Sequence, residues 1–208
     1  MTLQGVTFQG AALENPSKLQ GLPDALIELL WQVNGFVAYA GGLHFRGMVE
    51  EPSWHSFERY LSGGMSLHHL FHEVREYDIP FGQDFLGNQF LRRDGTVWRL
   101  RADTGEMSNM GVDLGNFLGE SRESPIEYLG LELLARYHQE HGMLEPGQLI
   151  HTMPPLCLAR DDSEPSLKAA PADEAVKFLS SIAKQVADVP DGEEVRLELV
   201  WPPKESIQ

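Results

Sequence analysis

The run Ile79–Gly105, IPFGQDFLGNQFLRRDGTVWRLRADTG, carries the clearest structural signals in the chain. Residues 89–93 and 96–101 are typical of two strands, and Asp94-Gly95 between them is a two-residue hairpin signal. Asp103-Thr104-Gly105 predicts a second turn, which leads to another short strand. The stretch therefore predicts antiparallel strands joined by tight turns.

Asp103-Thr104-Gly105 is also the tripeptide of aspartic protease active sites. These enzymes need two carboxylates that share one proton, so a single copy would require a homodimer with the aspartate on its symmetry axis. The approach through Arg99 and Arg101 places two cations on one face, where a protease needs an apolar wall. We therefore interpret the tripeptide as a turn between strands.

Composition places the chain among folded proteins. It has 208 residues, 42% hydrophobic and 23% charged, enough for one large domain or one domain with an added layer. No apolar run has the length of a membrane span, and the N-terminus lacks a secretory pattern. The one cysteine, Cys157, lies in the apolar context PPLCLA and is expected to be buried. These features predict a cytoplasmic protein in a reducing compartment.

The formal net charge of −15 disfavours direct binding to nucleic acid, because affinity for the phosphate backbone comes from Lys and Arg. An acidic surface suits solubility and also suits a basic partner.

Periodicity predicts both helices and strands. Apolar residues at helical spacing predict helices over residues 23–33, 53–61, 66–76, 124–142 and 173–187, with a shorter one after Asp113. Besides the central hairpin, strands are expected on both sides of Gly41-Gly42 and over residues 194–200, whereas residues 144–170 look irregular. Strands that cluster in hairpins favour an α+β fold, with a mainly antiparallel mixed sheet flanked by helices.

Histidines and tryptophans raise two further possibilities. His68 and His72 are four residues apart on a predicted helix, but the metalloprotease pattern needs Glu where His69 stands. We expect no metal site, and a metal-dependent hydrolase is kept only as an alternative. The tryptophans, Trp31 and Trp54 among them, are assigned to the core or its margin.

The order of motifs resembles a known family. An amphipathic helix that ends at Asn34-Gly35, a glycine-rich strand pair, Gly87-Asn88 with Phe90, and the turn at Asp94-Gly95 are similar to the SUKH superfamily, named partly after fungal cell-wall synthesis regulators. The resemblance covers roughly residues 20–120. It implies a SUKH-like domain over residues 1–143, with residues 144–208 as a C-terminal extension, a helix plus a strand, packed on the same domain.

The resemblance also implies function. Bacterial members are immunity proteins that neutralise polymorphic toxins, many of them nucleases, and fungal members are regulatory interaction proteins. No catalytic activity, catalytic residue or cofactor is implied, and Asn34, Gly35, Gly87 and Asn88 are expected to have structural roles as turn residues.

The leading hypothesis is a non-enzymatic immunity protein that binds a basic toxin domain. The alternative is a regulatory or scaffold module. Loop acids and a loop-adjacent aromatic residue are the candidate partner contacts: Glu50, Glu51, Trp54, Asp161, Asp162 and Glu164.

Overall fold

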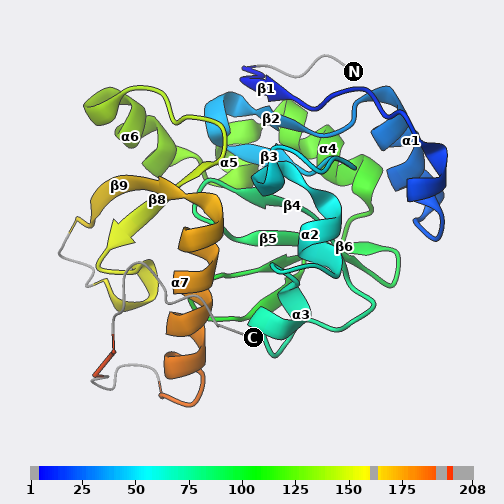
Figure 1. The fold of residues 1–208 in the computed structure, drawn as a ribbon. Coiled ribbons are helices and arrows are strands. Elements are labelled where there is room, and N and C mark those ends of the chain that lie inside the picture. The colour runs from blue at the N-terminus through cyan, green and yellow to red at the C-terminus, as the bar shows by residue number, and fades with distance from the viewer. Residues whose placement is uncertain (1–4, 160–163, 191–195, 199–208) are drawn as a thin grey trace.

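A seven-stranded antiparallel sheet forms the centre of the computed structural model, and its strands follow one another in chain order (Figure 1). The structure describes residues 5–159, 164–190 and 196–198. The strands are β1 (Phe8–Gln9), β2 (Phe36–Ala38), β3 (Leu43–Phe45), β4 (Ile79–Asp84), β5 (Gln89–Arg93), β6 (Thr96–Leu100) and β7 (Met107–Asn109). A separate hairpin consists of β8 (Gln148–Met153) and β9 (Ser166–Pro171). The predicted α+β class is confirmed.

The β5–β6 hairpin forms where the sequence predicts it. Arg93 pairs with Thr96, which leaves Asp94 and Gly95 as the loop, with φ of 50° and 88°. Positive φ at both loop residues is the geometry that matches the right-handed twist of paired strands. This turn sets the register of the central strands.

The turn between β4 and β5 is held by side chains. Asp84 Oδ1 accepts hydrogen bonds from the backbone N–H groups of Leu86 (2.9 Å) and Asn88 (3.0 Å). The amide of Asn88 donates to Asp84 Oδ2 at 2.8 Å and accepts from the N–H of Ala102 at 3.0 Å. Gly87 completes the turn with a φ of 86°. Asn88 therefore ties this turn to the segment that follows β6.

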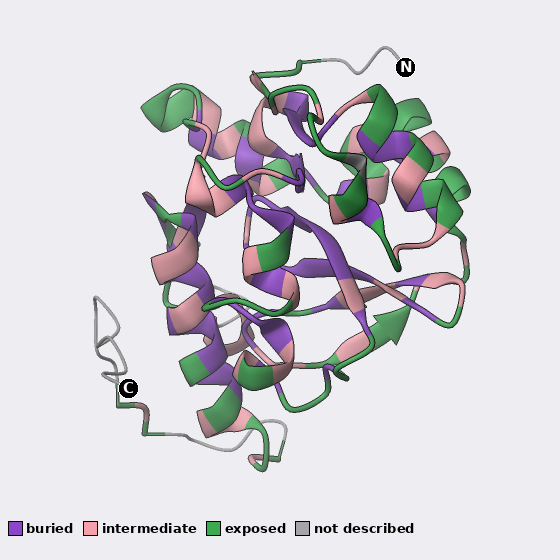
Figure 2. Cartoon of the chain, turned by 45° about the vertical axis from the view of Figure 1, so that its right-hand side comes forward, coloured by how far each residue is buried: buried purple, intermediate pink, exposed green. Residues whose placement is uncertain are grey.

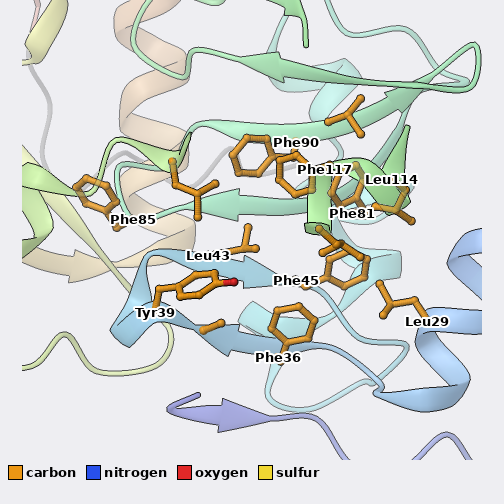
Figure 3. Packing of buried hydrophobic residues seen from close by; sticks show 14 of the residues in the cluster. Leu29, Phe36, Tyr39, Leu43, Phe45, Phe81, Phe85, Phe90, Leu114 and Phe117 are labelled. Atoms are coloured by element: carbon orange, nitrogen blue, oxygen red, sulfur yellow. The ribbon is translucent and has the colours of Figure 1, made fainter. Parts of the chain in front are cut away.

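Four helices cover one face of the sheet: α1 (Asp24–Gln32), α4 (Leu114–Glu123), α5 (Pro125–Leu129) and α6 (Glu132–His141). Asp113 caps α4 by accepting a hydrogen bond from Asn116 N at 2.8 Å, and Gly130, with a φ of 66°, ends α5. Aromatic rings from neighbouring strands fill the space beneath these helices, and Phe117 of α4 packs against Phe81 and Phe90 (Figure 3). We call this layer the first core.

The other face is covered by α2 (Phe57–Leu61), α3 (Leu67–Leu70), α7 (Ala172–Val186) and the β8–β9 hairpin (Figure 1). A second core lies between α7 and the sheet, with Leu91 and Leu100 among its sheet residues. The N–H of Ile150 in β8 donates to the carbonyl of Phe85 at 2.7 Å. The C-terminal segment thus packs directly on the central domain, and burial runs continuously from the sheet into α7 (Figure 2).

Several predicted elements differ in the structure. The helix predicted over 53–61 is a 3-10 turn, Ser53–His55, followed by α2, and the helix predicted over 66–76 ends at Leu70. Gly130 divides the predicted 124–142 helix into α5 and α6. Other 3-10 turns are Pro16–Leu19, Tyr39–Gly41 and Leu156–Leu158.

Predictions for the C-terminal part were partly wrong. Residues 144–170, expected to be irregular, contain β8 and most of β9. Of the strand predicted over 194–200, only residues 196–198 are described. They are not in a strand, and Leu197 packs against the second core. Among the described residues, no helix is long and apolar enough to span a bilayer.

Candidate functional site

The loop before α2 contains three of the predicted partner contacts. Glu50 is exposed and pairs with Lys18, at 3.1 Å, whereas Glu51 accepts a hydrogen bond from Ser53 N at 3.0 Å. The Trp54 ring packs against Phe8, 4.9 Å between ring centroids. The indole therefore packs within the fold, and the exposed side chains of this loop are those of Glu50 and Glu51.

The other predicted contacts fall near the start of β9. Asp161 and Asp162 lie outside the described residues. Glu164 is exposed and lies 3.3 Å from Arg136 Nη1. Glu164 comes from the β8–β9 connection and not from the Glu50–Glu51 loop, so the described acids belong to separate surface elements.

A different surface gathers acidic and apolar side chains on helices. The outward sides of α1, α4 and α5 expose the following residues, which we call the acidic helical face: Asp24, Glu28, Trp31, Glu120, Glu123, Ile126 and Glu127. The three helices all contribute buried side chains to the first core, and α4 contacts both α1 and α5.

The acidic helical face is built by helical spacing. Asp24, Glu28 and Trp31 are separated by four and three residues, which places them on one stripe of α1 opposite its buried leucines. Within the described residues, no carboxylate of this face forms an ion pair, and Arg122 is a cation that α4 also exposes.

Two large apolar side chains lie among these carboxylates. Trp31 is 52% exposed and Ile126 is 61% exposed. The assignment of Trp31 to the core or its margin was therefore wrong, although its spacing from Asp24 and Glu28 could have shown it. Trp is enriched among the residues that contribute most to protein–protein binding.

The His68–His72 spacing that raised the metal hypothesis does not fall on one helix in the structure. α3 ends before His72, whose side chain is fully exposed, so the four-residue spacing from His68 does not place both rings on one helix. His68 Nδ1 instead lies 2.8 Å from Ser66 Oγ. No group of three or more His, Cys, Asp or Glu side chains in the described part of the chain is placed to hold a metal ion.

Two other histidines form a buried pair. His55 Nε2 lies 3.3 Å from the carbonyl of Asn34 and so carries the proton of the neutral ring. Its Nδ1 then accepts from His44 Nε2 at 2.8 Å. Burial lowers the pKa of His55 to about 4, and burial together with the neighbouring His55 holds the pKa of His44 well below its usual value.

Asn34 and Gly35 surround this pair. The Asn34 amide donates to the carbonyls of Ala11 (2.9 Å) and Met48 (3.3 Å) and accepts from Met48 N at 2.7 Å. Gly35 has a φ of 77° and lies directly against the His55 ring. Both residues therefore have structural positions, since they join the end of α1 to the segment after β3.

The buried histidines predict a loss of stability in acid. Between pH 6.5 and about 4 the unfolded chain protonates His55 while the folded chain does not, so the free energy of unfolding falls as the pH falls through this range. A pKa shift of this size lowers the free energy of unfolding by about 3 kcal/mol for His55. Protonation of His44 in the unfolded chain adds a further loss. Urea unfolding at pH 7, 5.5 and 4.5 measures the effect.

The control for this prediction is the H44Q/H55Q double variant, whose amides form hydrogen bonds but do not titrate. Its free energy of unfolding should depend less on pH over the same range. Equal pH dependence in the two proteins would show that other groups, such as the surface carboxylates, cause the loss.

A buried cation lies beside the histidine pair. Arg46 has no exposed surface, and its guanidinium donates to the carbonyls of Pro80 (3.3 Å) and Gly82 (3.2 Å). It also donates to Gln83 Oε1 (2.7 Å) and Gln89 Oε1 (2.6 Å).

The aromatic ring of Tyr60 covers this guanidinium, 3.6 Å from ring centroid to Arg46 Cζ. The Tyr60 hydroxyl donates to Asp173 of α7 at 2.9 Å. Burial lowers the pKa of Arg46 to about 10, so the side chain remains charged at neutral pH. Arg46 thus anchors a polar layer between the sheet and α2.

Asp103 of the Asp-Thr-Gly tripeptide is largely buried in a turn in which Gly105 N donates to the carbonyl of Arg101 at 2.8 Å. Its carboxylate accepts from the backbone N–H of Cys157 at 2.9 Å. The turn prediction is confirmed, and Asp103 also docks the segment after β8. Burial raises the pKa of Cys157 to about 12, which keeps the thiol protonated and unreactive at neutral pH.

Comparisons with known proteins add evidence on the fold. No protein-family model matches the chain, and no curated protein matches it. The crystal structure of Atu4351 from Agrobacterium tumefaciens is similar, with a TM-score of 0.50 and 11% sequence identity over 84% of this chain and 85% of that chain. At this identity the likeness concerns the fold alone.

Proposed function

We propose that the chain is a non-enzymatic protein-binding domain that docks a basic protein on its acidic helical face. The observation that carries this proposal is that α1, α4 and α5, which pack in succession, expose Trp31, Ile126 and several carboxylates that form no ion pair with any described residue. Like-signed carboxylates around two apolar anchors complement a partner with basic residues around an apolar pocket.

The partner that fits this chemistry, and the resemblance to SUKH immunity proteins, is a basic toxin domain of the kind made by competing bacteria. Many enzymes that act on nucleic acid have basic surfaces, because they contact phosphates. An acidic protein that covers such a surface would compete with the toxin's substrate without any catalytic step. A regulatory partner of the same charge would also fit, and it is distinguished by the assay below.

The test is growth rescue. The chain is co-expressed with basic toxin domains encoded beside its gene, and we expect survival with one of them and a complex in pull-down experiments. Binding to a basic cellular protein without rescue would support the regulatory alternative. Absence of both rescue and binding would contradict the proposal.

Charge reversal locates the surface. The E28K/E123K double variant should slow association about tenfold at low salt, and the difference should shrink as salt rises. The matched control is E50K/E51K, with the same charge change on the loop before α2. Loss of binding only in this control would place the partner on the loop and not on the acidic helical face.

A further inference from the structure

A cavity of about 180 Å³ opens where the C-terminal segment meets the sheet. The turn between β4 and β5, the end of β6, strand β8 and helix α7 form its walls. Its polar lining consists of Asn88, Arg99, Arg101, Asp103, His151 and Thr152. This cavity lies apart from α1, α4 and α5, which carry the acidic helical face.

Two guanidinium groups reach this cavity from neighbouring positions. Arg99 is in β6 and Arg101 directly follows it, and alternate residues of an extended chain point to the same side. Both are partly exposed, with 34% and 47% of their side-chain surfaces accessible.

Arg99 has donors that the fold leaves unused. Its Nη2 donates to Asp84 Oδ2 at 2.9 Å, and its Nε is buried without a hydrogen-bond partner in the part of the chain that the structure describes. Among the described residues, the Arg101 side chain is held only by long contacts, 3.4 Å to Asp103 and 3.3 Å to Glu106. The buried Nε is not accessible from the cavity, so a ligand would contact the accessible part of the Arg99 guanidinium together with that of Arg101.

The two carboxylates near the cavity, Asp84 and Asp103, in contrast already accept hydrogen bonds from other groups of the protein. Asp84 has no exposed side-chain surface and accepts four hydrogen bonds, from Leu86 N, Asn88 N, the Asn88 amide and Arg99. Asp103 is nearly buried and binds the N–H of Cys157 as well as Arg101. The cavity wall therefore offers donors to a ligand more readily than acceptors.

The opposite wall is apolar and consists of Leu86, Ile150, Leu156 and Leu179. Ligand sites commonly combine such a wall with a few convergent polar groups. We propose that this cavity binds a small organic anion, whose carboxylate or phosphate group contacts Arg99 and Arg101 while its apolar body packs on these aliphatic side chains. The proposal goes beyond protein binding and does not depend on it.

The probes are benzoate, its neutral counterpart benzamide, and inorganic phosphate. Each is titrated into ¹⁵N-labelled full-length protein, and the arginine Nε–H resonances are followed. We expect benzoate to shift the Arg99 resonance saturably and benzamide to leave it unchanged. Inorganic phosphate should bind more weakly than benzoate because it makes no apolar contact.

Two variants complete the test. R101Q removes a half-exposed guanidinium without touching the core, and it should weaken benzoate binding about tenfold, as loss of a charge-assisted hydrogen bond does. R75Q removes an exposed arginine outside the cavity and should have no effect. The proposal is overturned if benzoate gives no saturable shift, if benzamide binds equally well, or if R75Q weakens binding as much as R101Q.

Discussion

Replacement of Arg46 by methionine is expected to lower the free energy of unfolding by about 4 kcal/mol. Methionine keeps an unbranched stem but removes the donors that serve Gln83 Oε1, Gln89 Oε1 and two backbone carbonyls. Gln83 Oε1 keeps the Gln89 amide as a donor at 3.2 Å, but the other acceptors lose the Arg46 donor, and a buried acceptor without a donor costs about 1–3 kcal/mol before partial rearrangement. Chemical denaturation at pH 7 measures the loss.

The unusual feature of Arg46 is that it forms no ion pair within the described residues. Its charge is stabilised by carbonyl and amide dipoles and by the Tyr60 ring. A buried charge is unfavourable in itself, and replacement of an entire buried polar group by apolar residues is often neutral. The R46M/Q83L/Q89L triple variant should therefore recover at least half of the stability that R46M loses.

The matched control is R92M. Arg92 lies in β5, is partly exposed and has no ion pair in the described part of the chain, so its replacement should change the free energy of unfolding by less than about 0.5 kcal/mol. If R46M were as mild as R92M, the polar layer would contribute little to the fold.

The elements that were predicted correctly are those whose signal lies within one short stretch of the sequence. Asp94-Gly95 determines its hairpin because the two loop residues themselves have the required positive φ. Helix α7 was predicted almost to its ends because its apolar spacing persists over fifteen residues.

The errors come from interactions between distant parts of the chain. Helix α3 stops at Leu70 although its pattern continues, and Phe71 and Val74 then enter the second core. Strands β8 and β9 pair across a long connection, and neither carries a clear alternation alone. Tertiary packing determines both the end of α3 and the pairing of β8 with β9. Information about such packing is not present in the local pattern of a single sequence.

The two proposed functional surfaces differ in the same respect: the acidic helical face follows from local sequence, whereas the cavity depends on distant contacts. The stripe of Asp24, Glu28 and Trp31 is regular helical spacing and was open to prediction once α1 was assigned. The cavity joins Arg99 and Arg101 to β8 and α7, more than 45 residues further along the chain, so only the folded arrangement shows it. The polar layer around Arg46 could not be predicted from local sequence either. Arg46 contacts Gln83 and Gln89 only after β3, β4 and β5 pair.

Gly35 tests whether the Asn34-Gly35 turn is a required part of the fold. The G35A variant is expected to lose about 4 kcal/mol of stability or not to fold at all. Its φ of 77° disfavours any residue with a Cβ, and the added methyl would lie 2.5 Å from Gly47 N and closer still to the His55 ring. Left-handed strain accounts for about 1 kcal/mol, and overpacking against a buried ring and backbone accounts for the rest.

The G21A variant separates the effect of left-handed backbone strain from the effect of steric overlap. The φ of Gly21, 87°, is equally left-handed, but a methyl group there would meet no atom of the described residues within 4 Å. G21A should therefore lose only about 1 kcal/mol in the same denaturation experiment, and the difference between the variants is the steric part. Equal losses would mean that backbone strain alone makes Gly35 necessary. A mild loss in G35A would mean that the His55 ring can move aside, and the acid sensitivity of that variant should then also change.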